Sequence, residues 1–277
     1  MQVSRQQWSP PAGTLGRIVA ESHARVAGLL GNRRAVQEIE RAVAAVPAAP
    51  SFLAALRRSD IALIAEVKRR SPSRGEINAA LSAREQAAAY AAGGAAALSV
   101  LTEPVHFGGS LDDLRAASGV VAVPALRKDF IVHEVQLLEA RANGAAAALL
   151  IVRALAPIEL ETLVLRARAV GLEPLVEVHS DTELDRALTA GARVIGVNNR
   201  DLETLQIDAA TGDRLLPLVP RACIAVSESG MLARSDVERA ARAGADAALI
   251  GSVLSAAADP ERALRALTGV PRSTRER

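Results

Sequence analysis

Eight short apolar runs, each leading into a turn, are the feature that most constrains the fold of this 277-residue chain. The runs are continuous rather than alternating in polarity, as is typical of parallel strands covered on both faces. They span Ile61–Val67, Ala96–Leu101, Val121–Leu126, Ala147–Val152, Glu173–Val178, Val194–Val197, Cys223–Val226 and Ala247–Ile250. Helical patterns lie between most of them, over Ala83–Ala92, Leu111–Ala117, Glu134–Ala142, Pro157–Val170, Asp181–Ala190, Ala233–Ala243 and, after the last run, Pro260–Leu267.

This alternation predicts an α/β fold of the (β/α)8 class, the TIM barrel. An open doubly wound sheet is the alternative, but no G-x-G-x-x-G turn follows the first strand and eight similar units favour closure. We assign residues 61–270 to the barrel, 1–60 to an N-terminal helical extension packed on it, and 271–277 to a flexible tail. The extension, with helices expected near Thr14–Leu30 and Ala35–Ala45, could cap either the floor of the barrel or its mouth.

The composition argues against several classes of protein. The chain is 50% hydrophobic and has a net charge of +2, with its basic residues scattered among acids, so no nucleic-acid partner is expected. We find neither a signal-peptide pattern nor the roughly 18 continuous apolar residues of a membrane helix, so the expectation is a cytoplasmic protein without a membrane partner. Because no His/Cys cluster occurs in the sequence, no metal is expected.

Lysine is rare in this chain. Of its 33 lysine and arginine residues only Lys68 and Lys128 are lysines, and each closes a predicted strand. The active sites of (β/α)8 barrels lie at those strand ends. A lysine can move its proton once its pKa is lowered from about 10.4, whereas an arginine stays charged. We therefore expect proton-transfer or substrate-anion roles for both lysines, with structural ion pairs as the alternative.

Acids and amides occupy other strand ends. Glu66 precedes Lys68 by two residues, so both side chains share one face of the first strand and form a carboxylate–ammonium pair facing the barrel interior. Glu177 lies at the end of the fifth strand, Asn198 and Arg200 follow the sixth, and Glu228 follows the seventh. These positions predict a polar site at the mouth of the barrel.

Small residues follow the last two strands, as Ser229-Gly230 and Gly251-Ser252. Many barrels bind phosphate there with backbone amides, so the sequence predicts a phosphate site. Phe107 and Phe130, two of only three phenylalanines, lie in strand-end loops. They could offer an apolar surface to an aromatic ring of a substrate, or simply anchor their loops.

Six ordered motifs resemble those of the indole-3-glycerol phosphate synthase family of tryptophan biosynthesis. They are residues 64–73 (IAEVKRRSPS), 99–103 (SVLTE), 127–130 (RKDF), 175–179 (LVEVH), 196–202 (GVNNRDL) and 227–230 (SESG). The resemblance covers about residues 14–268. It implies a lyase that uses no cofactor or metal and decarboxylates a phosphorylated small molecule. The family closes the indole ring of 1-(2-carboxyphenylamino)-1-deoxyribulose 5-phosphate, with loss of carbon dioxide and water.

The resemblance also implies roles for single residues. Lys128 would be the general acid that protonates the ketone oxygen, while Glu177 and the Glu66/Lys68 pair would serve the later proton transfers and the dehydration. Whether Lys68 or Glu177 donates the proton in the dehydration stays open. Asn198 would orient substrate hydroxyls. The remaining residues would support charged groups (Arg200, Glu228), hold the phosphate (Ser71, Ser229, Gly230, Gly251, Ser252) and bracket the anthranilate ring (Phe107, Phe130, Leu149).

Rival functions remain on the residues alone. A sugar-phosphate isomerase barrel would need a Cys or Asp acid–base pair at strands 1 and 5 or 6, whereas this chain offers the Glu66–Lys68 pair, Lys128 and Glu177. A Schiff-base aldolase would use a barrel lysine as nucleophile. A non-catalytic barrel would merely bind a phosphorylated ligand. Apart from the small-molecule substrate we expect no partner beyond a monomer or weak oligomer.

Overall fold

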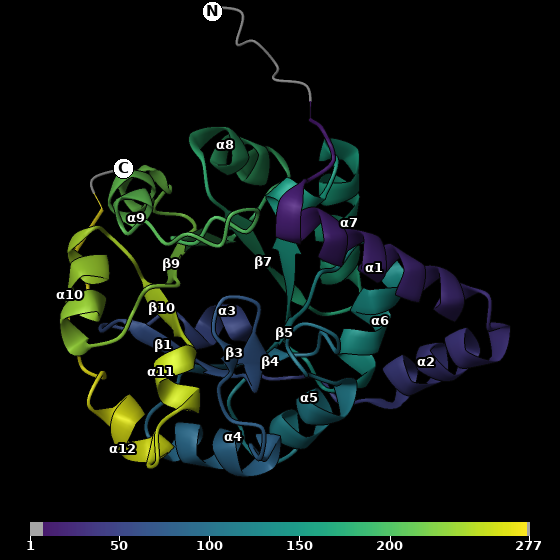
Figure 1. Ribbon diagram of the computed structural model, residues 1–277, viewed down its shortest axis with the longest axis horizontal. Coiled ribbons are helices and arrows are strands. Elements are labelled where there is room, and N and C mark those ends of the chain that lie inside the picture. The colour runs from purple at the N-terminus through teal and green to yellow at the C-terminus, as the bar shows by residue number, and fades with distance from the viewer. Residues whose placement is uncertain (1–7, 276–277) are drawn as a thin grey trace, which may run out of the picture.

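Eight parallel strands close into one barrel in the computed structural model, which describes residues 8–275 (Figure 1). They are β1 (Ala62–Val67), β4 (Ala97–Leu101), β5 (Ala125–Lys128), β6 (Ala147–Ile151), β7 (Glu173–Val178), β8 (Val194–Asn198), β9 (Ile224–Glu228) and β10 (Ala247–Ile250). Each strand pairs with the next along the chain, and β1 closes the barrel by pairing with β10, where Ala62 lies opposite Ala247. The predicted (β/α)8 class is confirmed.

Helices cover the outside of the barrel because the strands are largely apolar and need burial on both faces. The ring consists of α4 (Ala83–Ala92), α5 (Leu111–Ser118), α6 (Glu134–Ala142), α7 (Pro157–Ala169), α8 (Asp181–Thr189), α9 (Ala210–Leu215), α10 (Arg234–Arg242) and α12 (Pro260–Arg265), with the short α11 (Ser252–Ser255) directly after β10 (Figure 1). Several helices begin where a side-chain oxygen accepts a hydrogen bond from a free backbone N–H. Ser82, Ser110, Ser180 and Asp259 act in this way for α4, α5, α8 and α12.

Two local features differ from the sequence-based expectation. The third strand begins at Ala125 rather than Val121, since the preceding residue, Pro124, has no N–H to contribute to a strand ladder. A small antiparallel hairpin was not expected after the first strand. It pairs β2 (Arg70–Ser71) with β3 (Gly75–Glu76), and the turn over residues 72–74 leads into Gly75, whose φ of 68° suits glycine.

The N-terminal extension reaches the mouth of the barrel. It contains α1 (Gly13–Leu30), α2 (Arg33–Ala45) and α3 (Phe52–Ala55). Leu15 and Ile18 of α1 line the cavity at the strand ends, and Ser22 Oγ donates a hydrogen bond to the Phe130 carbonyl at 2.6 Å. Meanwhile α2 packs against α6 (Figure 1). The first helix therefore covers the mouth, while the division of the chain at residue 60 stays a prediction.

The C-terminal segment, expected to be a flexible tail from residue 271, instead contacts the barrel up to Arg275. Arg275 is only 8% exposed, and its guanidinium pairs with the buried Asp246 at 2.8 Å. Arg272 pairs with the same carboxylate. Residues 276–277 lie outside the described part of the chain. Within that part, no helix is both long and apolar enough to span a membrane.

Candidate active site

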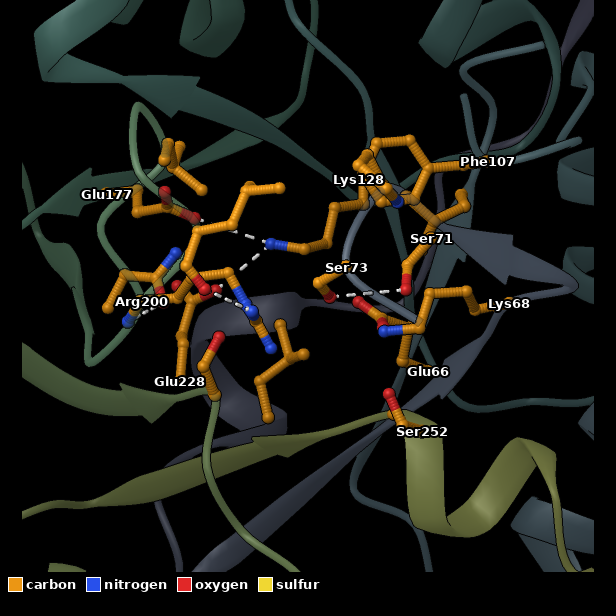
Figure 2. Close-up of a pocket in the computed structure, with 18 of the residues that line it drawn as sticks. Glu66, Lys68, Ser71, Ser73, Phe107, Lys128, Glu177, Arg200, Glu228 and Ser252 are labelled. Atoms are coloured by element: carbon orange, nitrogen blue, oxygen red, sulfur yellow. Dashed lines mark hydrogen bonds and ion pairs between the residues drawn. The ribbon is translucent and has the colours of Figure 1, made fainter. Parts of the chain in front are cut away.

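A cavity of about 340 Å³ lies at the C-terminal ends of the strands. Every site residue predicted from the sequence lines it: Glu66, Lys68, Ser71, Phe107, Lys128, Phe130, Leu149, Glu177, Asn198, Arg200, Glu228, Ser229, Gly230, Gly251 and Ser252. Figure 2 shows several of these side chains pointing toward one another across the cavity. The strand-end rule and the family resemblance thus selected residues that share one space, although they are far apart in the sequence.

At the C-terminal end of β1, Glu66 and the adjoining Lys68 form the expected ion pair. The two residues alternate along the strand, and Lys68 Nζ lies 2.5 Å from Glu66 Oε1 (Figure 2). Gly251 lies directly against this pair, since a Cβ there would be 2.2 Å from Glu66 Oε1 and 3.0 Å from Lys68 Nζ. The glycine is therefore needed for steric room beside the pair, in addition to any part in binding phosphate.

The second lysine sits among carboxylates. Lys128 Nζ lies 3.1 Å from Glu228 Oε2 and 3.4 Å from Glu177 Oε2 (Figure 2). Burial opposes the charge and would lower the pKa of Lys128, but Glu228, Glu177 and Glu66 outweigh it and raise that pKa above its ordinary value. For Lys128 the expectation of a lowered pKa is therefore wrong, and its side chain is a charged ammonium at neutral pH.

Glu228 is a buried carboxylate with an unusual environment. Burial raises its pKa to about 7, although the neighbouring Lys128 acts in the opposite direction. Its Oε1 has no hydrogen-bond partner among the described residues. That oxygen lies against Gly196 of β8, where a Cβ would come within 2.0 Å of it. Gly196 opens one of the family motifs, but its role of leaving space for Glu228 is visible only in the structure.

Asn198 and Arg200 present donors to the cavity. The Oδ1 of Asn198 accepts a hydrogen bond from the Arg200 backbone N–H at 2.9 Å, which leaves the amide nitrogen of Asn198 as the group available to a ligand. The Arg200 guanidinium donates to the Leu205 carbonyl at 2.7 Å. Burial, together with the positive charge of Arg74, lowers the pKa of Arg200. The arrangement suits hydroxyl and anionic groups.

The turn after β9 carries backbone strain at the predicted phosphate site. Ser229 has a φ of 65° and Gly230 a φ of 81°, and the left-handed conformation of a serine costs on the order of 1 kcal/mol. Such strain is typical of ligand-binding turns. The hydroxyls of Ser71 and Ser73, from the β2–β3 hairpin, lie 3.5 Å apart and line the same cavity (Figure 2).

Phe107 and Phe130 meet at the mouth, with ring centroids 6.1 Å apart and ring planes tilted by 38°. Buried carboxylates hold the two loops. Glu103 accepts hydrogen bonds from the Phe107 N–H and the two preceding backbone amides, and Asp129 accepts one from the Phe130 N–H at 2.8 Å. Arg25 of α1 bridges these carboxylates at 3.2 and 3.3 Å. Arg25 could not be recognised as part of this arrangement from the sequence, since nothing in the chain signals its two partners.

One group near this mouth brings together atoms that could hold a metal ion. Ligand atoms of Glu21, Glu103 and His106 lie within 4.8 Å of one another. Protein groups already occupy them, since Glu103 accepts three backbone hydrogen bonds and His106 Nε2 lies 2.7 Å from Glu21 Oε2. These hydrogen bonds explain why the three side chains lie together: they anchor the loop that carries Phe107.

Fold and site together define the class: a (β/α)8-barrel enzyme with its polar groups gathered at the C-terminal ends of the strands. The particular family follows from comparison with known proteins, since the model of the indole-3-glycerol phosphate synthase family matches residues 15–267. The chain belongs to this family of carboxy-lyases of tryptophan biosynthesis.

Two relatives illustrate the similarity. The indole-3-glycerol phosphate synthase of Opitutus terrae is 50% identical over 252 residues, which are 88% of this chain and 94% of the relative. Indole-3-glycerol phosphate synthase 2 of Streptomyces coelicolor is 46% identical over 261 residues, covering 93% and 100%. Among solved structures, thiamine phosphate pyrophosphorylase of Pyrococcus furiosus has a TM-score of 0.57 at 15% identity, over 76% of this chain and 95% of that one. The structural likeness supports the fold alone.

Proposed function

We propose that this protein closes the indole ring of 1-(2-carboxyphenylamino)-1-deoxyribulose 5-phosphate by general acid–base catalysis with lysine and glutamate side chains. The observation that carries the proposal is the position of Lys128, whose ammonium lies between Glu177 and Glu228 in a cavity that it shares with the Glu66–Lys68 pair. The family and the named relatives support the overall reaction.

Ring closure comes first. The aromatic carbon that bears the carboxylate attacks the ketone, and negative charge develops on the ketone oxygen. Lys128 donates its proton there, and its raised pKa is compatible with this role because the developing alkoxide is far more basic than an amine. The charged ammonium also stabilises the oxyanion before the proton moves.

Decarboxylation and dehydration follow. Loss of carbon dioxide returns the electrons of the breaking bond to the ring, and a poorly solvated carboxylate favours it; Phe107, Phe130 and Leu149 provide such a surface. The new hydroxyl then departs as water. Lys68 and Glu177 serve this step as an acid–base pair, one giving a proton to the hydroxyl and the other accepting one from carbon.

The remaining residues bind the substrate. Ser71, Ser229, Gly230, Gly251 and Ser252 hold the phosphate, with Asn198 orienting the sugar hydroxyls and Arg200 and Glu228 supporting the charged groups. A Schiff-base aldolase is less well supported, because its lysine must lose its proton to act as a nucleophile. The carboxylates around Lys128 oppose that loss.

The direct test is to incubate the purified protein with the carboxyphenylamino-deoxyribulose phosphate and record indole fluorescence. The proposal expects stoichiometric product without added metal or cofactor. Borohydride added during turnover tests the rival aldolase reaction, since a covalent lysine adduct would favour an aldolase.

We further infer a cytoplasmic monomer or weak oligomer without nucleic-acid or membrane partners, and light scattering during gel filtration checks the oligomeric state.

A further inference from the structure

A second, smaller chamber lies beside Glu177, and the reaction sequence above gives it no role. Its volume is about 140 Å³, enough for a few water molecules at roughly 30 Å³ each. Glu177 and Arg200 line both this chamber and the main cavity. Its other charged or titratable lining groups are Arg153, His179, Glu183, Asp201 and Glu203. The chamber therefore connects a buried carboxylate of the site with polar groups nearer the surface.

His179 is held in one tautomer at this chamber. Its Nδ1 lies 2.7 Å from the Asn198 backbone carbonyl, and a carbonyl can only accept, so Nδ1 carries the proton. The neutral imidazole thus keeps Nε2 as a proton acceptor. The backbone N–H of His179 donates to Glu183 Oε2 at 2.8 Å. This half-buried ring has a fixed orientation and one basic nitrogen to spare.

Glu177 and His179 line one chamber and lie two residues apart in the chain. They alternate on β7 and the residue after it, so their Cα atoms are about 6.6 Å apart along an extended strand, and their side chains line the same chamber. Water in this chamber can bridge the two side chains, because an ordered water connects polar groups that do not touch directly. The strand geometry thus offers a route from the imidazole to the carboxylate.

The proposed reaction consumes one proton per turnover. The ketone oxygen gains two protons before it leaves as water, whereas only one proton is lost, from the carbon beside the ring nitrogen. The difference balances the negative charge of the carboxylate, which departs as neutral carbon dioxide. A site largely covered by α1 and its loops therefore needs a path for a proton from the solvent.

We propose that this proton enters through the second chamber, taken from solvent by Nε2 of His179 and passed by water to Glu177. From Glu177 it restores the proton of Lys128, whose Nζ lies 3.4 Å away. The imidazolium formed in transit is stabilised by Glu183 and Asp201 and opposed by Arg153 and Arg200. His179 does not touch the substrate and acts through Glu177, as a positioning residue. The inference rests on the proposed function.

Two variants separate relay from structure. His179→Asn keeps a side-chain donor for the Asn198 carbonyl but has no titratable nitrogen, and His179→Ala removes both. We expect kcat to fall about 10-fold in both variants, more steeply above pH 7, with KM within about two-fold. Added imidazole should restore the turnover of His179→Ala. His23→Asn, an exposed change on α1, is the matched control.

The results of these experiments distinguish a proton relay through His179 from a purely structural role of its ring. Normal turnover of His179→Asn beside a slow His179→Ala would mean that the ring only fixes the Asn198 carbonyl, which overturns the relay. An unchanged pH profile, or no rescue by imidazole, would overturn it as well. Failure of the unmodified enzyme to form product would instead reject the proposed function, so the two failures are distinguishable.

Discussion

Lys128 Nζ lies 3.1 Å from Oε2 of Glu228, while the other oxygen of that carboxylate has no hydrogen-bond partner among the described residues. A buried oxygen without a partner costs about 1–3 kcal/mol. The pair is therefore only half satisfied by the protein, because Oε1 lies against Gly196 rather than a hydrogen-bond donor. This arrangement favours binding and proton transfer over stability of the ligand-free fold.

Glu228→Gln should change how stability depends on pH. The folded-state pKa of Glu228 is raised to about 7, above its unfolded value, so the folded state holds the extra proton between about pH 4.5 and 7. The native protein should lose about 2 kcal/mol of unfolding free energy from pH 5.5 to 8 that Glu228→Gln does not lose. Urea titrations of both proteins at the two pH values test this. Parallel pH dependence would contradict the raised pKa.

Gly196→Ala should impair the site from the neighbouring strand. The added Cβ would approach Glu228 Oε1 to 2.0 Å, which forces the carboxylate away from Lys128. We expect kcat to fall about 100-fold while circular dichroism stays native. Gly28→Ala on α1 is the control, since nothing lies within 4 Å of its Cβ position. Equal activity of the two variants would show that Glu228 has room to move.

Arg25→Met should loosen the aromatic loops together. The guanidinium bridges Glu103 and Asp129, which hold the loops of Phe107 and Phe130. We expect KM to rise about 10-fold, or roughly 1.4 kcal/mol, with kcat within about three-fold. Arg34→Met, at a side chain that is 86% exposed, provides the comparison. An unchanged KM would mean that the carboxylates hold the loops without Arg25.

Much of the fold was predictable because parallel strands have a strong signature. Continuous apolar runs placed seven strands to within about one residue at their start, and the strand-end rule selected residues that line one cavity. The predicted start of the third strand was wrong because Val121 and Val123 are apolar but lie outside the sheet, where they pack against core residues. The hydrophobicity of this segment indicates that it is buried, but it does not show whether its backbone pairs with a neighbouring strand.

Other features needed coordinates. The sequence shows that α1 has an apolar side but not that Leu15 and Ile18 face the cavity. The direction of the Lys128 pKa shift depends on distances to carboxylates from β1, β7 and β9, which no single segment encodes. Gly196 matters because it has no side chain, which leaves room for the Glu228 carboxylate on the neighbouring strand. Each of these features depends on how different strands and helices pack together, and not on the sequence of any one of them.

The most direct test of the central claim is the turnover of Lys128→Met, followed by indole fluorescence beside the unmodified enzyme. We predict a loss of about 1,000-fold or more with the fold preserved, and a large loss for Lys128→Arg as well, because the longer, planar guanidinium cannot take the place of the compact ammonium between Glu177 and Glu228. Near-normal turnover of Lys128→Met in a folded protein would contradict the assignment of Lys128 as the acid.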